Sequence, residues 1–345
     1  MMRFLSIIVC SLLLALTVAC SAKQPPLSEG YVLATNVLEG AVSIIDPKLE
    51  KEVARVRVTE ACGGGVEVFP RQIAVPADGR TAWVPLYSDI ELGGEGTDGR
   101  SIAIIDLVER KVAGCVDLGR PMRPHMGKFG PKDGLLYVTT ELDNSVTIVD
   151  PKTRSVVGSI STEAPLTHGL VISKDGTKIY TWNVNPGSIS VLDVPSRKLV
   201  KKIELGGQVQ FLALSKDDSL LYASDQNQLR LIVIDTGKNE VARYIKAPSV
   251  CYALAMSPDG NSLLAAVPYR AMIAKYDVSK SDEMITFSVL RNALSIAFRP
   301  DGQEAYVSGG TSSAVGIIDT KEWKARKWIP TGQEADGIAW APAAR

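Results

Sequence analysis

The chain contains only two histidines, His125 and His168, among its 345 residues. Histidine changes its charge near neutral pH, so a pair of them suits ligand recognition, proton transfer or metal binding. Two arginines, Arg71 and Arg123, lie near these histidines when the repeat of the sequence, described below, is taken into account. Their guanidinium groups favour an anionic ligand. Whether these four side chains can act together depends on the elements that carry them.

An aspartate ends an apolar stretch seven times along the chain. These residues are Asp46, Asp106, Asp150, Asp193, Asp235, Asp277 and Asp319, at intervals of 60, 44, 43, 42, 42 and 42 residues. A second series marks a turn at Gly79, Gly134, Gly176, Asp218, Gly260 and Gly302, and its last four steps are 42 residues. Two series with one period predict a unit that stacks on copies of itself. We interpret the repeated aspartates as turn formers that accept hydrogen bonds from backbone amides two residues on, and not as catalytic groups.

Each unit contains four predicted strands. In one unit, Leu254–Met256 is a short apolar strand, a Pro-Asp-Gly turn ends at Gly260, and Leu263–Val267 is the second strand. A third strand ends at Asp277 and a more polar fourth follows. Four strands per unit without helical periodicity predict the blades of an all-β, seven-bladed β-propeller.

The two ends of the chain predict how the ring closes. The C-terminal stretch "GIAWAPAAR" aligns with a first strand, whereas the N-terminal "GYVLATN" begins where a second strand belongs. We therefore expect the C-terminal strand to supply the innermost strand of the first blade, so that no sheet edge remains open. Residues 29–345 would then form one domain.

The stretch "YVTTELDNSVTIVDPKTRSVVGSI", from Tyr137, resembles the YVTN repeat of exported bacterial seven-bladed β-propeller proteins, and all seven units carry the pattern. This resemblance implies the propeller fold. It does not imply one function, because propellers of this kind serve haem-containing reductases, amine dehydrogenase subunits, lactonases and binding proteins.

Residues 1–19 have the features of a lipoprotein signal peptide, with Arg3 before an apolar run, Phe4–Val18, that is too short for a comfortable membrane span. The run ends in Thr-Val-Ala-Cys, which resembles a lipobox, so we predict lipidation of Cys20 and a tether over residues 20–28. Ordinary cleavage after Ala22 is the alternative. Either way the protein is expected to be exported, and an anchored form would face the periplasm or the cell exterior.

Export permits disulfides, and Cys62 and Cys115 fall near the outer edges of neighbouring units, where they could bridge. Cys251 lies in an apolar strand and is expected to be a buried thiol. The chain has no Cys-x-x-Cys-His haem attachment motif.

An acidic, glycine-rich stretch explains the long first interval of the repeat. It formally matches G-x-G-x-x-G from Gly94 to Gly99 but lacks the strand before and the helix after that a dinucleotide site needs. We interpret it as an insertion in blade 2, either a solvated loop or a calcium site. The acidic residues concerned are Asp89, Glu91, Glu95 and Asp98.

The candidate site comes from equivalent positions at the start of each innermost strand, where the mouth of the channel lies. These positions, eight residues before each turn mark, are Arg71, Met126, His168, Gln210, Tyr252, Leu294 and Asp336. Blade 3 has one extra residue, which allows His125 in place of Met126. We predict a small-ligand site formed by Arg71, His125, His168, Gln210, Tyr252 and Asp336.

The preferred functional hypothesis is a membrane-tethered module that binds a small molecule or a protein, because no recognised catalytic constellation occurs. Lys plus Arg equals Asp plus Glu at 38 each, which argues against a nucleic-acid partner. The alternative is an exported enzyme or cofactor-handling propeller, similar to amine dehydrogenase or haem reductase propellers, with its site at the channel mouth. Two histidines a blade apart resemble the distal pair of haem-binding periplasmic nitrite reductase propellers, but that family also uses a separate proximal histidine for the iron, and this chain has no third histidine. A metal held by His125 and His168 would have only Asp336 and Tyr252 as further ligands. No metal site is predicted and the cofactor is left unassigned.

Overall fold

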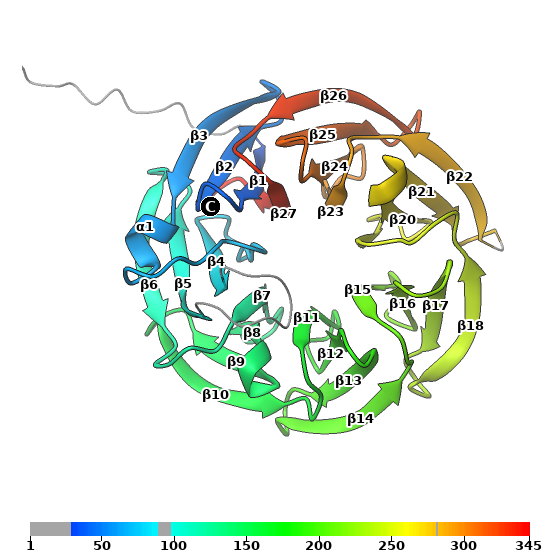
Figure 1. Ribbon diagram of the computed structural model, residues 1–345, viewed down its shortest axis with the longest axis horizontal. Helices are drawn as coiled ribbons and strands as arrows, with labels where there is room; N and C mark the ends of the chain where they lie inside the picture. Colours follow the sequence, from blue (N-terminus) through cyan, green and yellow to red (C-terminus); the bar gives the residue numbers. More distant parts are fainter. Residues whose placement is uncertain (1–28, 89–97, 281) are drawn as a thin grey trace, which may run out of the picture.

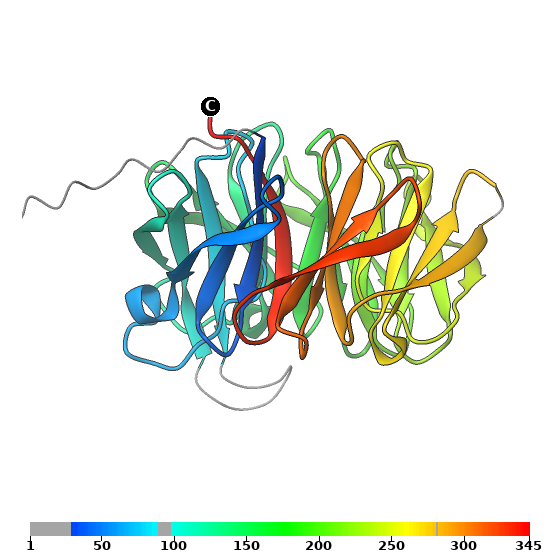
Figure 2. The same cartoon turned by 90° about the horizontal axis from the view of Figure 1, so that it is seen from above.

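A computed structural model describes residues 29–88, 98–280 and 282–345 of the chain. Seven antiparallel sheets surround a central channel, as Figure 1 shows, and the side view in Figure 2 shows the strands running between the two ends of the ring. The predicted all-β, seven-bladed propeller is therefore confirmed.

The strands follow one order in every blade, from the channel outward. Blade 1 consists of β27 (Ala335–Pro342), β1 (Gly30–Asn36), β2 (Ala41–Asp46) and β3 (Lys51–Arg57), and blade 2 of β4 (Thr81–Ser88), β5 (Asp98–Asp106) and β6 (Lys111–Asp117). Blade 3 consists of β7 (Pro124–Phe129), β8 (Leu136–Thr140), β9 (Ser145–Asp150) and β10 (Ser155–Ser161), and blade 4 of β11 (Thr167–Ile172), β12 (Lys178–Asn183), β13 (Ser188–Asp193) and β14 (Lys198–Glu204).

The remaining three blades repeat this order. Blade 5 consists of β15 (Val209–Leu214), β16 (Leu220–Asp225), β17 (Arg230–Asp235) and β18 (Glu240–Lys246), and blade 6 of β19 (Leu254–Met256), β20 (Ser262–Val267), β21 (Met272–Asp277) and β22 (Glu283–Ser288). Blade 7 consists of β23 (Ala293–Phe298), β24 (Glu304–Gly309), β25 (Ala314–Asp319) and β26 (Lys324–Pro330). Three short helices connect strands: α1 (Thr59–Cys62), η1 (Glu141–Asp143) and η2 (Pro268–Arg270).

The ring closes as the two ends of the sequence predict. Strand β27 pairs antiparallel with β1, in a register that runs from Gly30 opposite Pro342 to Asn36 opposite Ala335. In Figure 1 the last strand therefore lies beside the first, on the channel side of blade 1. The C-terminal strand thus covers the inner edge that β1 would otherwise expose.

Burial follows from the position of each strand in its blade. The middle strands are covered on both faces by neighbouring blades, and β1 is buried along its whole length. Outermost strands such as β6 instead alternate exposed and partly covered residues. Each blade consequently forms its core against the next blade, as expected for a stacked repeat.

The repeated aspartates form turns, as predicted. The carboxylate of Asp46 accepts the backbone amide of Lys48 at 2.9 Å, and Asp150 accepts that of Lys152 at 2.8 Å. Asp193 differs because the residue two positions on is Pro195, which has no N–H group, so the carboxylate accepts the amide of Ser196 instead.

The expected location of the extra residues in blade 2 was only partly right. Some of the extra residues lie before Arg71, the ring position of blade 2, in the connection that contains α1 and leads from β3 to residue 70. The other part separates β4 from β5, and the acidic stretch 89–97 considered for calcium lies outside the described residues. In blade 2 the innermost strand is reduced to two isolated bridges, Pro70 with Leu86 and Ala74 with Trp83.

A disulfide holds the α1 connection against its blade. Cys62 of α1 is bonded to Cys115 of β6, the outermost strand of blade 2. Cys251 is a buried free thiol, and burial raises its pKa to about 12. The predicted signal peptide, tether and lipidation site lie outside the described residues, and within those residues no helix is long and apolar enough to span a membrane.

Deleting Gly337 to Arg345 should prevent stable folding, because the deletion removes most of β27 and exposes the inner edge of β1. Circular dichroism melting of the full-length and truncated proteins measures the effect. A matched deletion of Ala343 to Arg345, which leaves β27 intact, should melt close to the full-length protein. A truncation at Gly337 that melts within a few degrees of the full-length chain would contradict closure by β27.

Candidate active site or ligand site at one mouth of the channel

Five of the innermost strands share a β-bulge at the predicted ring positions. In β11 the pairing register shifts between Thr167 and Gly169, and this shift leaves His168 outside the ladder. Equivalent shifts in other blades bracket His125, Gln210, Leu294 and Asp336. A bulge re-aims the side chain of the extra residue. The recurring bulges therefore turn a set of side chains toward one mouth of the channel, which we call the site mouth.

Hydroxyl groups of second strands hold the bulges and join neighbouring blades. Thr139 of β8 accepts the backbone amide of Met126 at 3.1 Å and donates to the carbonyl of His168, in the next blade, at 2.9 Å. The same bridge links Gly337 through Thr35 to Arg71, and Ser295 through Ser308 to Asp336. These buried hydroxyls tie a ring residue of one blade to the bulge of the blade before it.

A cavity of about 270 Å³ lies at the site mouth. All six predicted site residues line it: Arg71, His125, His168, Gln210, Tyr252 and Asp336. Gln72, Tyr87 and Phe211 complete the lining. The seventh ring position, Leu294, is not part of the lining.

The bulge in β7 decides between the two candidates in blade 3. Its register shift spans Pro124 to Gly127, so both His125 and Met126 lie outside the ladder. His125 lines the cavity, whereas Met126 belongs to the apolar core and its sulfur lies 3.5 Å from the backbone amide of Leu170. The expectation of one extra residue in blade 3 was wrong for this strand: the turn from β7 to β8 has the same length as the turn from β11 to β12 but carries its glycine, Gly134, one position later, so His125 is equivalent to His168.

The two imidazole rings are in direct contact. The ring centroids of His125 and His168 lie 3.5 Å apart with an interplanar angle of 27°. The ring of Tyr87 meets both edge-on, with centroid distances of 5.2 Å to His125 and 6.3 Å to His168. Both histidines are buried, with exposed fractions of 6% and 7%.

Glu141 is the central polar group that the ring positions did not predict. Its Oε1 lies 2.5 Å from Nδ1 of His168, and its Oε2 accepts a hydrogen bond of 2.5 Å from the hydroxyl of Tyr87. A carboxylate that contacts Nδ1 fixes the orientation of the imidazole. Nε2 is then the ring nitrogen that remains for contact with another group. Arg123 is buried nearby, where its carbonyl accepts the amide of Glu141 at 3.3 Å and its charge acts on Tyr87.

Tyr87 and Glu141 share a position in their blades, one residue after Leu86 and Thr140, where the regular register of the second strand with the third ends. The equivalent residues in the other blades are Val37, Val184, Gln226, Pro268 and Gly310. Only blades 2 and 3 therefore place a titratable side chain there. This unrepeated pair was the signal in the sequence that could have extended the predicted site.

Burial dominates the electrostatics of the cavity. Burial, followed by the nearby His168 and Arg71, holds the pKa of His125 well below its usual value, so that His125 is neutral near pH 7. Burial also raises the pKa values of Asp336, Tyr252 and Tyr87. For Asp336 the guanidinium of Arg71, 3.3 Å away, opposes that rise.

Three buried polar atoms around the cavity have no hydrogen-bond partner within the described part of the chain. They are Nε of Arg71, Nδ1 of His125 and Oε1 of Gln210. Leaving a buried polar atom unpaired costs about 1–3 kcal/mol, so such atoms are rare in stable proteins. All three atoms belong to residues that line the cavity, and these residues come from three blades.

The site does not fit a haem. A cavity of about 270 Å³ is smaller than pockets for drug-sized molecules, which begin at about 300 Å³. The described residues contain no cluster of three or more His, Cys, Asp or Glu side chains that could hold a metal. The contact between the two imidazoles also leaves no space between them for an ion.

The fold and the cavity define a seven-bladed β-propeller with a polar site at one mouth of its channel. Its structure is similar to that of hydrazine synthase from Kuenenia stuttgartiensis, at 17% identity over 80% of this chain and 90% of that chain, with a TM-score of 0.68. It is also similar to a functionally unknown protein from Desulfotomaculum acetoxidans, at 11% identity over 90% of this chain and 99% of that chain, with a TM-score of 0.73. These likenesses show the fold alone.

No protein-family model matches the sequence, and no curated protein matches it either. Membership of the YVTN-repeat family therefore stays a prediction from the repeat.

His125 should make stability fall at acid pH. The unfolded chain takes up a proton at this residue near pH 6.5, whereas the folded chain does not until far lower pH, so stability is lost as pH falls below about 6.5. Urea unfolding at pH 7.5 and 5.5 should show that the wild type loses about 1.4 kcal/mol more than His125→Gln over this interval.

Asp336 acts in the opposite sense, because its raised pKa gives stability at low pH that is lost as pH rises through the folded value. This contribution is common to both proteins and should cancel in the comparison. Equal losses in the wild type and in His125→Gln would show that His125 is not held neutral.

Proposed function

We propose that the protein binds a small carboxylate that also carries a hydrogen-bond donor, such as a hydroxy or amino acid, at the site mouth. The observation that carries the proposal is that three residues lining one cavity, Arg71, His125 and Gln210, each have a buried polar atom without a partner among the described residues. A ligand that pairs them would offset a cost of about 1–3 kcal/mol for each atom.

The chemistry of these atoms defines the ligand. The guanidinium of Arg71 only donates hydrogen bonds and favours an anionic oxygen, whereas Oε1 of Gln210 only accepts and needs a donor from the ligand. His125 is neutral and can meet either type of group. Phe211 and Tyr252, with ring centroids 5.5 Å apart, supply an aromatic wall against which a short carbon chain can pack.

Calorimetric titration with lactate and propionate tests this ligand class. Lactate should bind about tenfold more tightly, because propionate has no hydroxyl for Gln210. Gln210→Leu should remove most of that difference, and Arg71→Met should weaken both ligands. The matched control is Arg100→Met, which changes an exposed arginine of β5 and should leave both affinities unchanged.

Two results would contradict the binding proposal. One is the absence of binding across a panel of hydroxy, amino and dicarboxylic acids. The other is binding that Arg71→Met and Gln210→Leu leave unchanged.

A second candidate, an enzyme that transfers protons on the bound acid, is favoured by the contact of Glu141 with His168. A buried carboxylate that orients one imidazole, beside a second imidazole held neutral, is an arrangement suited to general acid–base catalysis. Nuclear magnetic resonance of the bound acid in deuterated water distinguishes the two functions. Exchange of carbon-bound hydrogen that is lost in His125→Gln would favour the enzyme, and unchanged ligand would favour the binding module.

We also propose that the propeller is exported and held at a membrane through a lipid on Cys20, as the lipobox-like sequence indicates. Cys20→Ser should move the protein from the membrane fraction to the soluble fraction, whereas Cys251→Ser, which changes a buried thiol, should not. Immunoblots of the two fractions measure the partition. Unchanged membrane partition of Cys20→Ser would contradict the anchor.

A further inference from the structure

A second hollow, of about 450 Å³, lies at the opposite mouth of the channel. It is lined by the ends of β7, β11, β15 and β19 and by the turns that follow them, whereas the site mouth lies at the beginnings of these strands. Strand β11, for example, carries His168 at one mouth and ends beside Lys174 at the other. The hollow is therefore separate from the candidate site described above.

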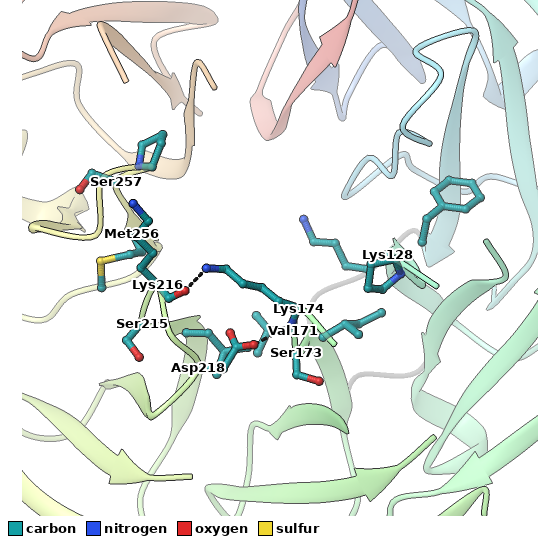
Figure 3. Close-up of a pocket in the computed structure, with 14 residues that line it drawn as sticks. Lys128, Val171, Ser173, Lys174, Ser215, Lys216, Asp218, Met256 and Ser257 are labelled. Atoms are coloured by element: carbon teal, nitrogen blue, oxygen red, sulfur yellow. Dashed lines mark hydrogen bonds between the residues drawn. The ribbon is translucent and has the colours of Figure 1, made fainter. Parts of the chain in front are cut away.

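Three lysines from three successive blades line this hollow, which we call the lysine mouth: Lys128, Lys174 and Lys216. Figure 3 shows the side chains of Lys128 and Lys174 extending over the hollow from neighbouring blades. Asp218 is the one carboxylate among the lining residues, and its Oδ2 already accepts the backbone amide of Lys174 at 2.6 Å. The lining thus carries an excess of positive charge.

The amine of Lys128 makes no hydrogen bond or ion pair with any residue that the structure describes. Solvent in the channel reaches this residue, but the surrounding strands remove part of its hydration and lower its pKa. The amine of Lys174 donates to the carbonyl of Lys216. Lys128 and Lys216 consequently have amines without an anionic partner among the described residues.

The wall beside the lysines is largely apolar. Phe129, Val171, Leu214 and Met256, from four blades, contribute partly covered hydrophobic side chains. Contact with an apolar chain would remove this surface from water, at about 25 cal/mol for each Å² covered. Positive charge over an apolar wall suits a molecule with an anionic head and an apolar body.

We infer that the lysine mouth binds a single-chain anionic amphiphile, with its carboxylate or phosphate head on Lys128 and Lys174 and its chain along the apolar wall. The lining comes from four blades around the channel mouth, which suits one molecule as the occupant and not the surface of a bilayer. This second site does not depend on the function proposed for the site mouth.

Titration calorimetry with decanoate, below its micellar concentration, tests the inference on the full chain carrying Cys20→Ser, which has no attached lipid. Decanoate should bind, and Lys128→Met should weaken it about tenfold by removing a charge-assisted contact. Decanol, which lacks the charge, and butyrate, which lacks the chain, should both bind at least tenfold more weakly than decanoate.

The controls separate this site from general charge effects and from the site mouth. Lys152→Met changes an exposed lysine of the same blade and should leave decanoate affinity unchanged, as should Arg71→Met at the other end of the channel. Equal weakening by Lys128→Met and Lys152→Met would overturn the inference. So would equal affinity for decanol and decanoate, or binding of anionic vesicles without binding of decanoate.

Discussion

The hydroxyl bridge between neighbouring blades is the interaction on which the candidate site depends. A bulge by itself leaves a backbone amide without its ladder partner, and a buried amide needs another acceptor. Thr139 supplies it for Met126 and uses its own hydrogen to hold the carbonyl of His168. The same group thus stabilises one bulge and positions the ring residue of the next blade, which explains why a hydroxyl recurs in the second strands of blades 1, 3, 5 and 7.

The seam of the ring is part of the same arrangement. Thr35 of β1 accepts the amide of Gly337 in β27 and donates to the carbonyl of Arg71, both at 2.8 Å. Only glycine fits at position 337, because a Cβ atom there would lie 2.0 Å from the carbonyl oxygen of Arg71. Across this seam Arg71 meets Asp336. Ring closure therefore builds one wall of the candidate site as well as covering a sheet edge.

The period of the sequence predicts most of the fold because each blade is specified separately. Turn aspartates, turn glycines and apolar strands recur in every unit, so one misread unit would not have hidden the others. Rotational equivalence then predicts the ring residues, and six of them do line one cavity. Departures from the repeat were harder to place, and α1 and the division of the extra residues in blade 2 were not predicted.

The groups that were missed reach the site from other strands. Tyr87 lies near the end of the second strand β4 and Glu141 directly follows the second strand β8, so counting positions along the innermost strands could not find them. The choice between His125 and Met126 also depended on where the turn glycine Gly134 lies relative to the paired strands, which the pairing register of β7 with β8 reveals. The bridge from Cys62 to Cys115 was allowed by the sequence, but its formation depends on how the α1 connection folds against β6.

The central claim is that residues lining the site mouth carry buried, unpartnered polar atoms in order to hold a small acid. A crystal structure of the protein soaked with lactate, at a resolution that distinguishes it from water, tests this claim most directly. The account predicts a carboxylate within hydrogen-bond distance, about 2.7–3.2 Å, of Arg71 and a hydroxyl at the same distance from Oε1 of Gln210. A cavity that holds only water molecules, each bonded to the atoms of Arg71, His125 and Gln210, would contradict it.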